Sequence, residues 1–162
     1  MGSGARTATV TVVSGGALVF SAAIAALAPG PAVAQSNEVS ARLEALLGNH
    51  EPYEDFLLAL KDAVATGDRE AVAAMIAYPL TTTIARGRVT MTSEKDSLEH
   101  YDQLFTPTVA AAIVRQGYAS LFANAEGVMI GDGVISFSGT CSDDACAETS
   151  VKVIAVNAPD RG

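Results

Sequence analysis

An uncharged apolar run near the start of the chain limits most strongly what the remaining residues can fold into. Residues 8–28 contain only Ala, Val, Leu, Ile, Phe, Gly, Ser and Thr, and Arg6 is the one basic residue before them. Residues 29–31, Pro-Gly-Pro, end the run with helix-breaking residues. A basic start, an apolar stretch and a break are successive parts of a secretory signal peptide.

The residues after this break complete the signal-peptide pattern. Residues 32–34 read Ala-Val-Ala, and small side chains at these positions fit the narrow pockets of signal peptidase. We therefore predict a signal peptide over residues 1–34, cleavage between Ala34 and Gln35, and a periplasmic or secreted location. The alternative is a retained membrane anchor, because the run is long enough to span a bilayer. Its paired glycines and many alanines make it only mildly hydrophobic, which favours cleavage.

The remaining residues have the size and charge of one small acidic domain. Residues 35–162 number about 128, enough for one domain with its own core but not for two. The first 34 residues hold one of the chain's 10 basic residues and none of its 18 acidic residues, so the rest has a formal charge of −9. An acidic surface repels nucleic-acid phosphates and anionic lipid headgroups. We expect no nucleic-acid partner, and no membrane contact after cleavage.

The two cysteines of the chain, Cys141 and Cys146, are separated by four polar or small residues that favour a turn. An even number of cysteines in an oxidising compartment favours a disulfide, and two strands joined by this turn would bring the thiols together. A redox pair and a metal site are the alternatives. The spacing is not C-x-x-C, and His50 and His100 are the only histidines that could complete a metal site. We predict a structural disulfide and no metal.

Helical patterns dominate the first half of this domain. Apolar residues at helical spacing occupy residues 39–47, 53–64 and 72–76. Gly67 supplies a left-handed stop for the second helix, and Asp68 is suited to the N-cap of the third. Residues 35–51 are expected to form a linker or a short helix that precedes the main domain.

The second half alternates between strand and helix patterns. Candidate strands are residues 80–84, 89–92, 119–125, 128–130, 134–140 and 149–157, and candidate helices are residues 93–105 and 106–117. Ser93 and Asp96 resemble a capping box, and Thr106 is suited to an N-cap before Pro107. In the last strand we expect Val151, Val153 and Ala155 on one face, with Ile154 and Val156 on the other.

The predicted order of elements is α-α-β-β-α-α-β-β-β, with residues 158–162 as a disordered tail. Such an order is typical of an α+β domain, in which helices are grouped around a mostly antiparallel sheet.

Four short motifs resemble a group of small exported bacterial proteins. They are residues 78–80 (Tyr-Pro-Leu), 101–106 (Tyr-Asp-Gln-Leu-Phe-Thr), 127–133 (Gly-Val-Met-Ile-Gly-Asp-Gly) and 155–157 (Ala-Val-Asn). The order of elements is similar to the NTF2-like, or cystatin-like, cone fold. The resemblance covers residues 52–157 and implies that N-terminal helices pack in the concave side of a curved sheet. It implies no reaction, because members of this fold include enzymes, carriers and binding modules.

One departure from the group concerns the strand after residue 133. That strand usually carries a tryptophan, whereas this chain has none, and Phe137 is expected to fill a similar core position. Tyr78 and Tyr101 are expected to line the cavity of a cone and to offer their hydroxyls to a ligand. We therefore predict Tyr78, Tyr101 and Phe137 as ligand-binding residues. The alternative is that both tyrosines pack their rings and satisfy their hydroxyls locally.

Candidate catalytic residues are few. His100 and Asp102 invite an acid–base interpretation, but residues two apart on a helix do not converge. The sequence has no nucleophile elbow, phosphate-binding loop, dinucleotide-binding motif or zinc-protease motif. We predict no catalytic residue and no cofactor.

The function predicted is that of a non-catalytic periplasmic binding or interaction domain, which holds a small apolar ligand or a periplasmic protein in a concave pocket. The alternative is a small cone-fold enzyme, a lyase, isomerase or hydrolase, that acts on an apolar ligand. A homodimer formed through the outer face of the sheet is a further expectation.

The first testable prediction concerns the N-terminus. We expect the protein recovered from the exporting cell to begin at Gln35, because the small residues before it fit the peptidase. N-terminal sequencing of the purified protein measures this directly. A mature protein that still begins at Met1 would contradict cleavage and favour the retained anchor.

Overall fold

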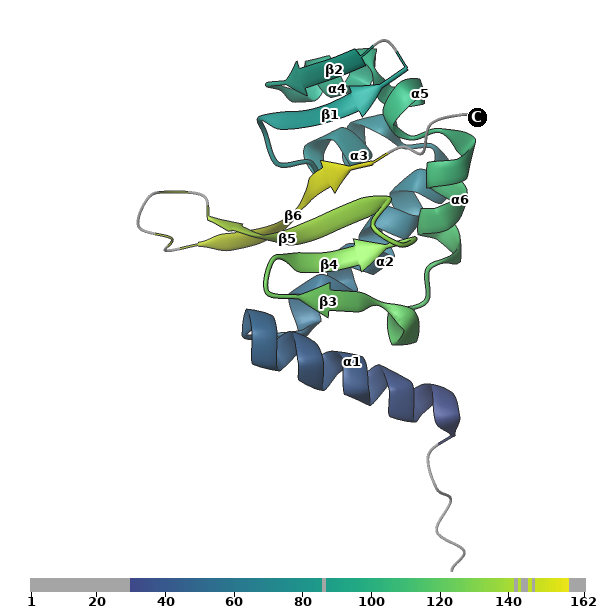
Figure 1. Cartoon of the computed structure of the whole chain (residues 1–162), viewed down its shortest axis with the longest axis vertical. Helices are drawn as coiled ribbons and strands as arrows, with labels where there is room; N and C mark the ends of the chain where they lie inside the picture. The colour runs from purple at the N-terminus through teal and green to yellow at the C-terminus, as the bar shows by residue number, and fades with distance from the viewer. Residues whose placement is uncertain (1–29, 86, 142, 144–145, 147, 158–162) are drawn as a thin grey trace, which may run out of the picture.

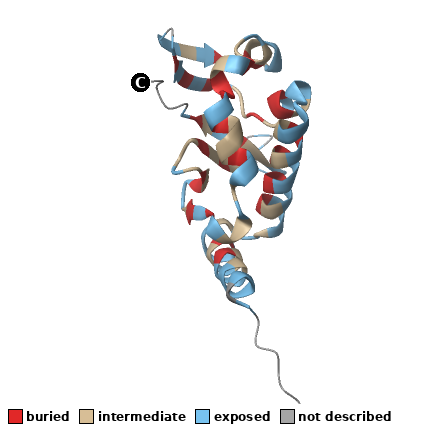
Figure 2. Ribbon diagram, turned by 90° about the vertical axis from the view of Figure 1, so that its right-hand side faces the viewer, coloured by how far each residue is buried: buried red, intermediate tan, exposed pale blue. Residues whose placement is uncertain are grey.

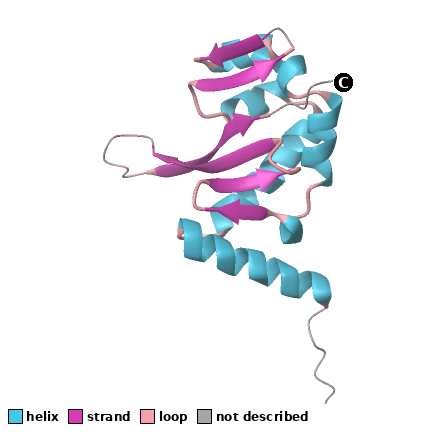
Figure 3. Cartoon of the chain, in the orientation of Figure 1, coloured by secondary structure: helices cyan, strands magenta, loops and turns pink. Residues whose placement is uncertain are grey.

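The computed structural model describes residues 30–85, 87–141, 143, 146 and 148–157. Helices and antiparallel strands alternate in blocks along these residues, which confirms the predicted α+β class (Figure 3). Residues 1–29 of the predicted signal peptide and the predicted tail, residues 158–162, lie outside the described part of the chain.

Three helices open the fold: α1 (Pro31–Leu47), α2 (Glu51–Thr66) and α3 (Arg69–Ala74). Gly67 has a φ of 73° and ends α2, and the Asp68 carboxylate caps α3 by accepting a hydrogen bond from the Ala71 N–H. Both details confirm the sequence prediction. Helix α1 is longer than the predicted short helix and contains Ala34 and Gln35. Its Val39 and Leu43 side chains are buried in the same core as α2.

A hairpin and three short helices follow. The hairpin consists of β1 (Leu80–Ile84) and β2 (Gly87–Met91), and the helices are α4 (Glu94–Glu99), α5 (Tyr101–Leu104) and α6 (Pro107–Arg115). A single helix was predicted where α4 and α5 lie. The backbone of His100 leaves the helical region, with a φ of −105° and a ψ of 7°, and separates the two.

Three hydrogen bonds hold the N-terminus of α4. Ser93 Oγ accepts from the Asp96 N–H at 3.3 Å, as the capping-box pattern predicts. The Asp96 carboxylate accepts from Thr92, through its N–H and its Oγ1, each at 2.8 Å. This carboxylate thus ties the residue before the N-cap to the first turn of the helix. Hydrogen bonds that stabilise the charged carboxylate lower the pKa of Asp96, and the bond from the Thr92 N–H is the largest cause.

Four strands close the fold. The 3-10 helix η1 (Tyr118–Ser120) leads into β3 (Phe122–Asn124), β4 (Gly127–Ile130), β5 (Ile135–Cys141) and β6 (Thr149–Val156). They pair antiparallel in the order β3-β4-β5-β6. They correspond to the four candidate strands over residues 119–157, although the predicted order of elements counted only three strands there.

The segment between α3 and β1 and the side chain of Thr82 in β1 bond the free edge of β6. The Ala77 N–H donates to the Val153 carbonyl at 2.9 Å, and the Val153 N–H donates to the Met75 carbonyl at 2.8 Å. Thr82 Oγ1 donates to the Val156 carbonyl. The hairpin therefore continues the layer of the four-stranded sheet (Figure 1). At the opposite edge α1 packs beside β3 and η1, where the hydroxyls of Ser40 and Tyr118 lie 3.0 Å apart.

The core lies on one face of the four-stranded sheet. Helices α2 and α6 pack on this face, and Figure 2 shows buried residues where strands and helices meet. Phe137 of β5 is fully buried, with its ring centroid 5.0 Å from that of Phe56 and 6.3 Å from that of Tyr53. No described helix covers the other face of the sheet (Figures 1 and 3).

A β-bulge changes the predicted facing of the last strand. The register between β5 and β6 shifts at Ser136 and Phe137. Val153 and Val156 are consequently both buried, whereas Ile154 is exposed. Strict alternation, which places Val153 and Val156 on opposite faces, is therefore wrong here, because the bulge adds one residue to the strand.

Beyond the sheet, β5 and β6 extend together as a two-stranded arm (Figure 1). A disulfide joins Cys141 and Cys146 near the end of this arm, with their Cα atoms 4.7 Å apart. This confirms the predicted pairing. Both cysteines are exposed.

The hydrogen bonds of Asp96 generate a prediction about stability and pH. We expect Asp96→Asn to unfold at a lower urea concentration than the wild type at pH 7. A carboxyl with a lowered pKa stabilises the fold fully above its ordinary pKa of 3.8, and this contribution is lost as the pH falls through the lower folded-state value. The difference between wild type and variant should therefore shrink in acid.

Urea unfolding at a series of pH values, followed by circular dichroism, measures this difference. The control variant is Glu126→Gln, which removes an exposed carboxylate from the turn between β3 and β4. A difference between wild type and Asp96→Asn that stays constant down to pH 2 would contradict the assignment of the effect to ionisation.

Candidate functional site

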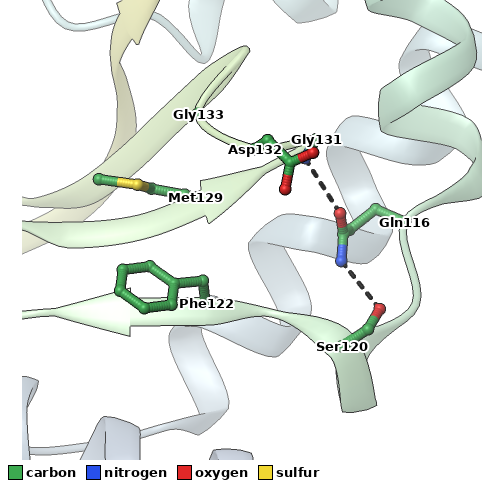
Figure 4. Close-up of a pocket in the computed structure, with 7 residues that line it drawn as sticks. All are labelled: Gln116, Ser120, Phe122, Met129, Gly131, Asp132 and Gly133. Atoms are coloured by element: carbon green, nitrogen blue, oxygen red, sulfur yellow. Dashed lines mark hydrogen bonds between the residues drawn. The ribbon is translucent and has the colours of Figure 1, made fainter.

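A pocket of about 390 Å³ lies on the open face of the sheet, at the end where η1 enters β3. Figure 4 shows its lining, which comes from the residue after α6, from η1, from two neighbouring strands and from the turn between β4 and β5. The lining residues are Gln116, Ser120, Phe122, Met129, Gly131, Asp132 and Gly133.

One wall of the pocket is apolar. Phe122 of β3 and Met129 of β4 are directly opposite each other in the strand register. Their neighbours Ala123 and Val128 point into the core, so strand alternation turns Phe122 and Met129 outward. Phe122 is 57% exposed, a large value for an aromatic side chain.

The turn that follows β4 forms the opposite, polar wall. Its three residues Gly131, Asp132 and Gly133 all have positive φ values, of 56°, 56° and 88°. A Cβ atom at Gly131 would lie 3.0 Å from the Ala112 Cβ of α6, so glycine permits both the backbone shape and the close packing. The turn presents the exposed Asp132 side chain at the rim of the pocket.

Gln116 holds the two sides of the polar wall together. Its Oε1 accepts a hydrogen bond from the Gly131 N–H at 3.2 Å, and its Nε2 donates to Ser120 Oγ and to the Gly117 carbonyl, each at 3.1 Å. The Gln116 carbonyl accepts from Lys61 Nζ at 2.6 Å, which connects this wall to α2. The pocket is therefore shaped by a fixed side chain.

The three predicted ligand-binding residues lie elsewhere. Phe137 is enclosed in the core between Tyr53 and Phe56 and has no exposed surface. The Tyr78 hydroxyl donates to the Ala73 carbonyl at 2.9 Å and lies within hydrogen-bonding distance of Ser97 Oγ. Burial raises the pKa of Tyr78.

Tyr101 is also enclosed by local contacts. Its ring stacks on that of Phe105, with centroids 5.0 Å apart, and the Arg69 guanidinium lies 4.8 Å above its centroid. Burial raises the pKa of Tyr101. Tyr78 and Tyr101 thus have the packed, locally satisfied surroundings that were the alternative to ligand binding.

His100 and Asp102 do not form a pair. Both carboxylate oxygens of Asp102 accept from Arg69, at 2.7 and 3.2 Å, whereas His100 Nδ1 lies 3.3 Å from Gln103 Nε2. The two side chains therefore have different partners on the surface.

Sequence reasoning missed the pocket. Residues 127–133 are part of a motif of the resemblance and contain the candidate strand 128–130, but no pattern connects them with Gln116 or Phe122, which lie in other elements. Phe122 is the residue that could have indicated the pocket. It is an aromatic residue on the solvent side of its strand, because its neighbour Ala123 points into the core.

Two further features bear on the kind of site. Within the described ranges, no group of three or more His, Cys, Asp or Glu side chains is arranged to hold a metal ion. No helix in the described part of the chain has the length and apolar character needed to cross a membrane.

Comparison with known proteins adds no assignment. No protein-family model, no curated protein and no solved structure matches this chain.

Proposed function

We propose that this chain is an exported, non-catalytic binding domain of the NTF2-like type that holds a small molecule on the open face of its sheet. The observation that carries the proposal is the pocket itself. In this pocket the apolar side chains of Phe122 and Met129 face a polar turn that a hydrogen bond to Gln116 holds in place. A few polar groups that converge on an apolar wall are typical of small-molecule sites.

The arrangement of layers supports the NTF2-like part of the proposal. N-terminal helix α2 and helix α6 pack on one face of an antiparallel sheet, and the preceding β1–β2 hairpin, a separate two-stranded sheet, lies beside β6. These features agree with helices packed in the concave side of a curved sheet. Export is supported by the signal-peptide pattern and by the disulfide between Cys141 and Cys146.

The lining of the pocket supports binding over catalysis. Asp132 is its one ionisable residue, and neither histidine belongs to it. His50 Nδ1 lies 2.8 Å from a Glu44 carboxylate oxygen, and His100 is adjacent to Gln103. A lyase, isomerase or hydrolase at this pocket would depend on Asp132 alone for proton transfer, because the lining holds no second acid or base.

The binding proposal predicts a response confined to the pocket. We expect a panel of small aromatic compounds, with cationic, neutral and anionic members, to include binders that shift amide signals of residues 129–133 in ¹⁵N–¹H NMR spectra. Phe122→Ala should weaken these binders, because it removes the ring that forms the apolar wall.

A matched control is Leu58→Ala on α2, since Leu58 is 58% exposed and Phe122 is 57% exposed. This variant should bind as the wild type does. The proposal fails if no member of the panel shifts these signals, or if Leu58→Ala weakens binding as much as Phe122→Ala.

A second candidate function is self-association through the same face. Phe122 and Ile154 are exposed on the open side of the sheet, and none of the strands β3, β4, β5 and β6 contains Asp or Glu. A second copy could approach this face with little like-charge repulsion, although the whole chain has a formal charge of −8.

Self-association predicts a change of mass with concentration. We expect sedimentation equilibrium at micromolar concentrations to show a dimer of the wild type, and Ile154→Lys to shift it to the monomer by placing charges in the interface. Leu58→Lys on α2 is the control and should leave the dimer intact. A wild-type monomer across this range would exclude the second candidate.

A further inference from the structure

We infer that the ligand of this pocket is an organic cation, an ammonium group attached to an aromatic or alkyl body. The inference rests on the proposed binding function and names the class of ligand. Its basis is the polar wall of the pocket. The side-chain donors of this wall are hydrogen-bonded within the protein, whereas some of its acceptor oxygens have free lone pairs.

The side-chain donors of the lining are occupied within the protein. Both Nε2 hydrogens of Gln116 have acceptors, in Ser120 Oγ and the Gly117 carbonyl. The Ser120 hydroxyl donates to the Gly117 carbonyl at 3.0 Å, so its one hydrogen is also used. Gln116 Oε1 and Ser120 Oγ each keep a free lone pair.

Three N–H groups at the glycine-rich turn are already used within the protein. Successive residues with positive φ can direct their N–H groups at an anion. Here the Gly131 N–H donates to Gln116, the Gly133 N–H to the Ile130 carbonyl at 3.2 Å and the Val134 N–H to the Gly131 carbonyl at 3.2 Å. These three donors are directed back into the protein. A phosphate or a carboxylate would find none of them available.

Asp132 supplies the charge that selects a cation. Its carboxylate has no hydrogen bond or ion pair with any residue in the described ranges, and it is exposed at the pocket rim (Figure 4). The turn holds Asp132 at a φ of 56°, which few residues other than Gly, Asn and Asp adopt readily. The fold therefore keeps a free negative charge opposite the apolar wall.

The apolar wall is suited to the rest of such a ligand. An aromatic face attracts a nearby ammonium group, and a thioether adapts its shape to an apolar body. Phe122 and Met129 provide these groups side by side. A bare metal ion is a poorer fit, because a single carboxylate leaves most of the six or more oxygen ligands of Ca²⁺ unsupplied.

The test compares three probes of almost the same shape and different charge: phenethylammonium, phenethyl alcohol and phenylacetate. Each is titrated at low ionic strength into ¹⁵N-labelled protein, and the dissociation constant is taken from the amide shifts of Gly131 and Gly133. We expect phenethylammonium to bind most tightly and phenylacetate most weakly. Added salt should weaken the cation's binding, because it screens an exposed charge.

Asp132→Asn removes the charge and retains a residue that tolerates positive φ, so the turn should be preserved. We expect it to weaken phenethylammonium about fivefold, the upper range for an exposed ion pair, and to leave phenethyl alcohol unchanged. Glu126→Gln, an exposed carboxylate in the neighbouring turn, is the control and should alter neither probe.

The outcomes separate this inference from the proposed function. If phenethyl alcohol or phenylacetate shifts the pocket signals with an affinity equal to that of the cation, the pocket binds small molecules and the cation inference is overturned. The same holds if Asp132→Asn binds phenethylammonium as the wild type does. If none of the probes shifts these signals, both the inference and the proposed function fail.

Discussion

The burial of one face of the sheet under α2 and α6 is the constraint on which the rest of the structure depends. Phe137 lies at its centre, enclosed by aromatic side chains of α2. Because successive strand residues point to opposite faces, directing Ala123 and Val128 to the core turns Phe122 and Met129 to solvent. The open face and its pocket are consequences of how the core is packed, and a change of register in β3 or β4 would remove both.

The pocket is connected to this core by few contacts. Gln116 follows α6, receives a hydrogen bond from Lys61 of α2 and bonds the turn after β4. The spacing between the apolar and polar walls is thereby set by the position of two helices. Close packing of Gly131 on Ala112 of α6 adds a second constraint on the same turn. A site built in this way is largely formed before a ligand arrives, which lowers the ordering cost of binding.

The sequence predictions are correct where a feature depends on residues close together in the chain, and they fail where it depends on contacts between distant segments. The caps at Asp68 and Ser93 and the stop at Gly67 were predicted because each depends on residues a few positions apart. The break at His100 and the bulge in β6 were missed, because tertiary packing decides them. Phe137 takes the core position expected for it, whereas Gln116, which joins distant elements, was not identified for the same reason.

The disulfide near the end of the β5–β6 arm has a consequence for the covalent connectivity of the molecule. The peptide bonds between Cys141 and Cys146 belong to a small closed ring. A protease that cuts one of them opens the ring but does not divide the protein into two pieces. Strand β6, with its buried Val153 and Val156, would stay attached to β5 through the sulfur atoms. The chain can therefore be cut between these cysteines without release of the strand that completes the sheet.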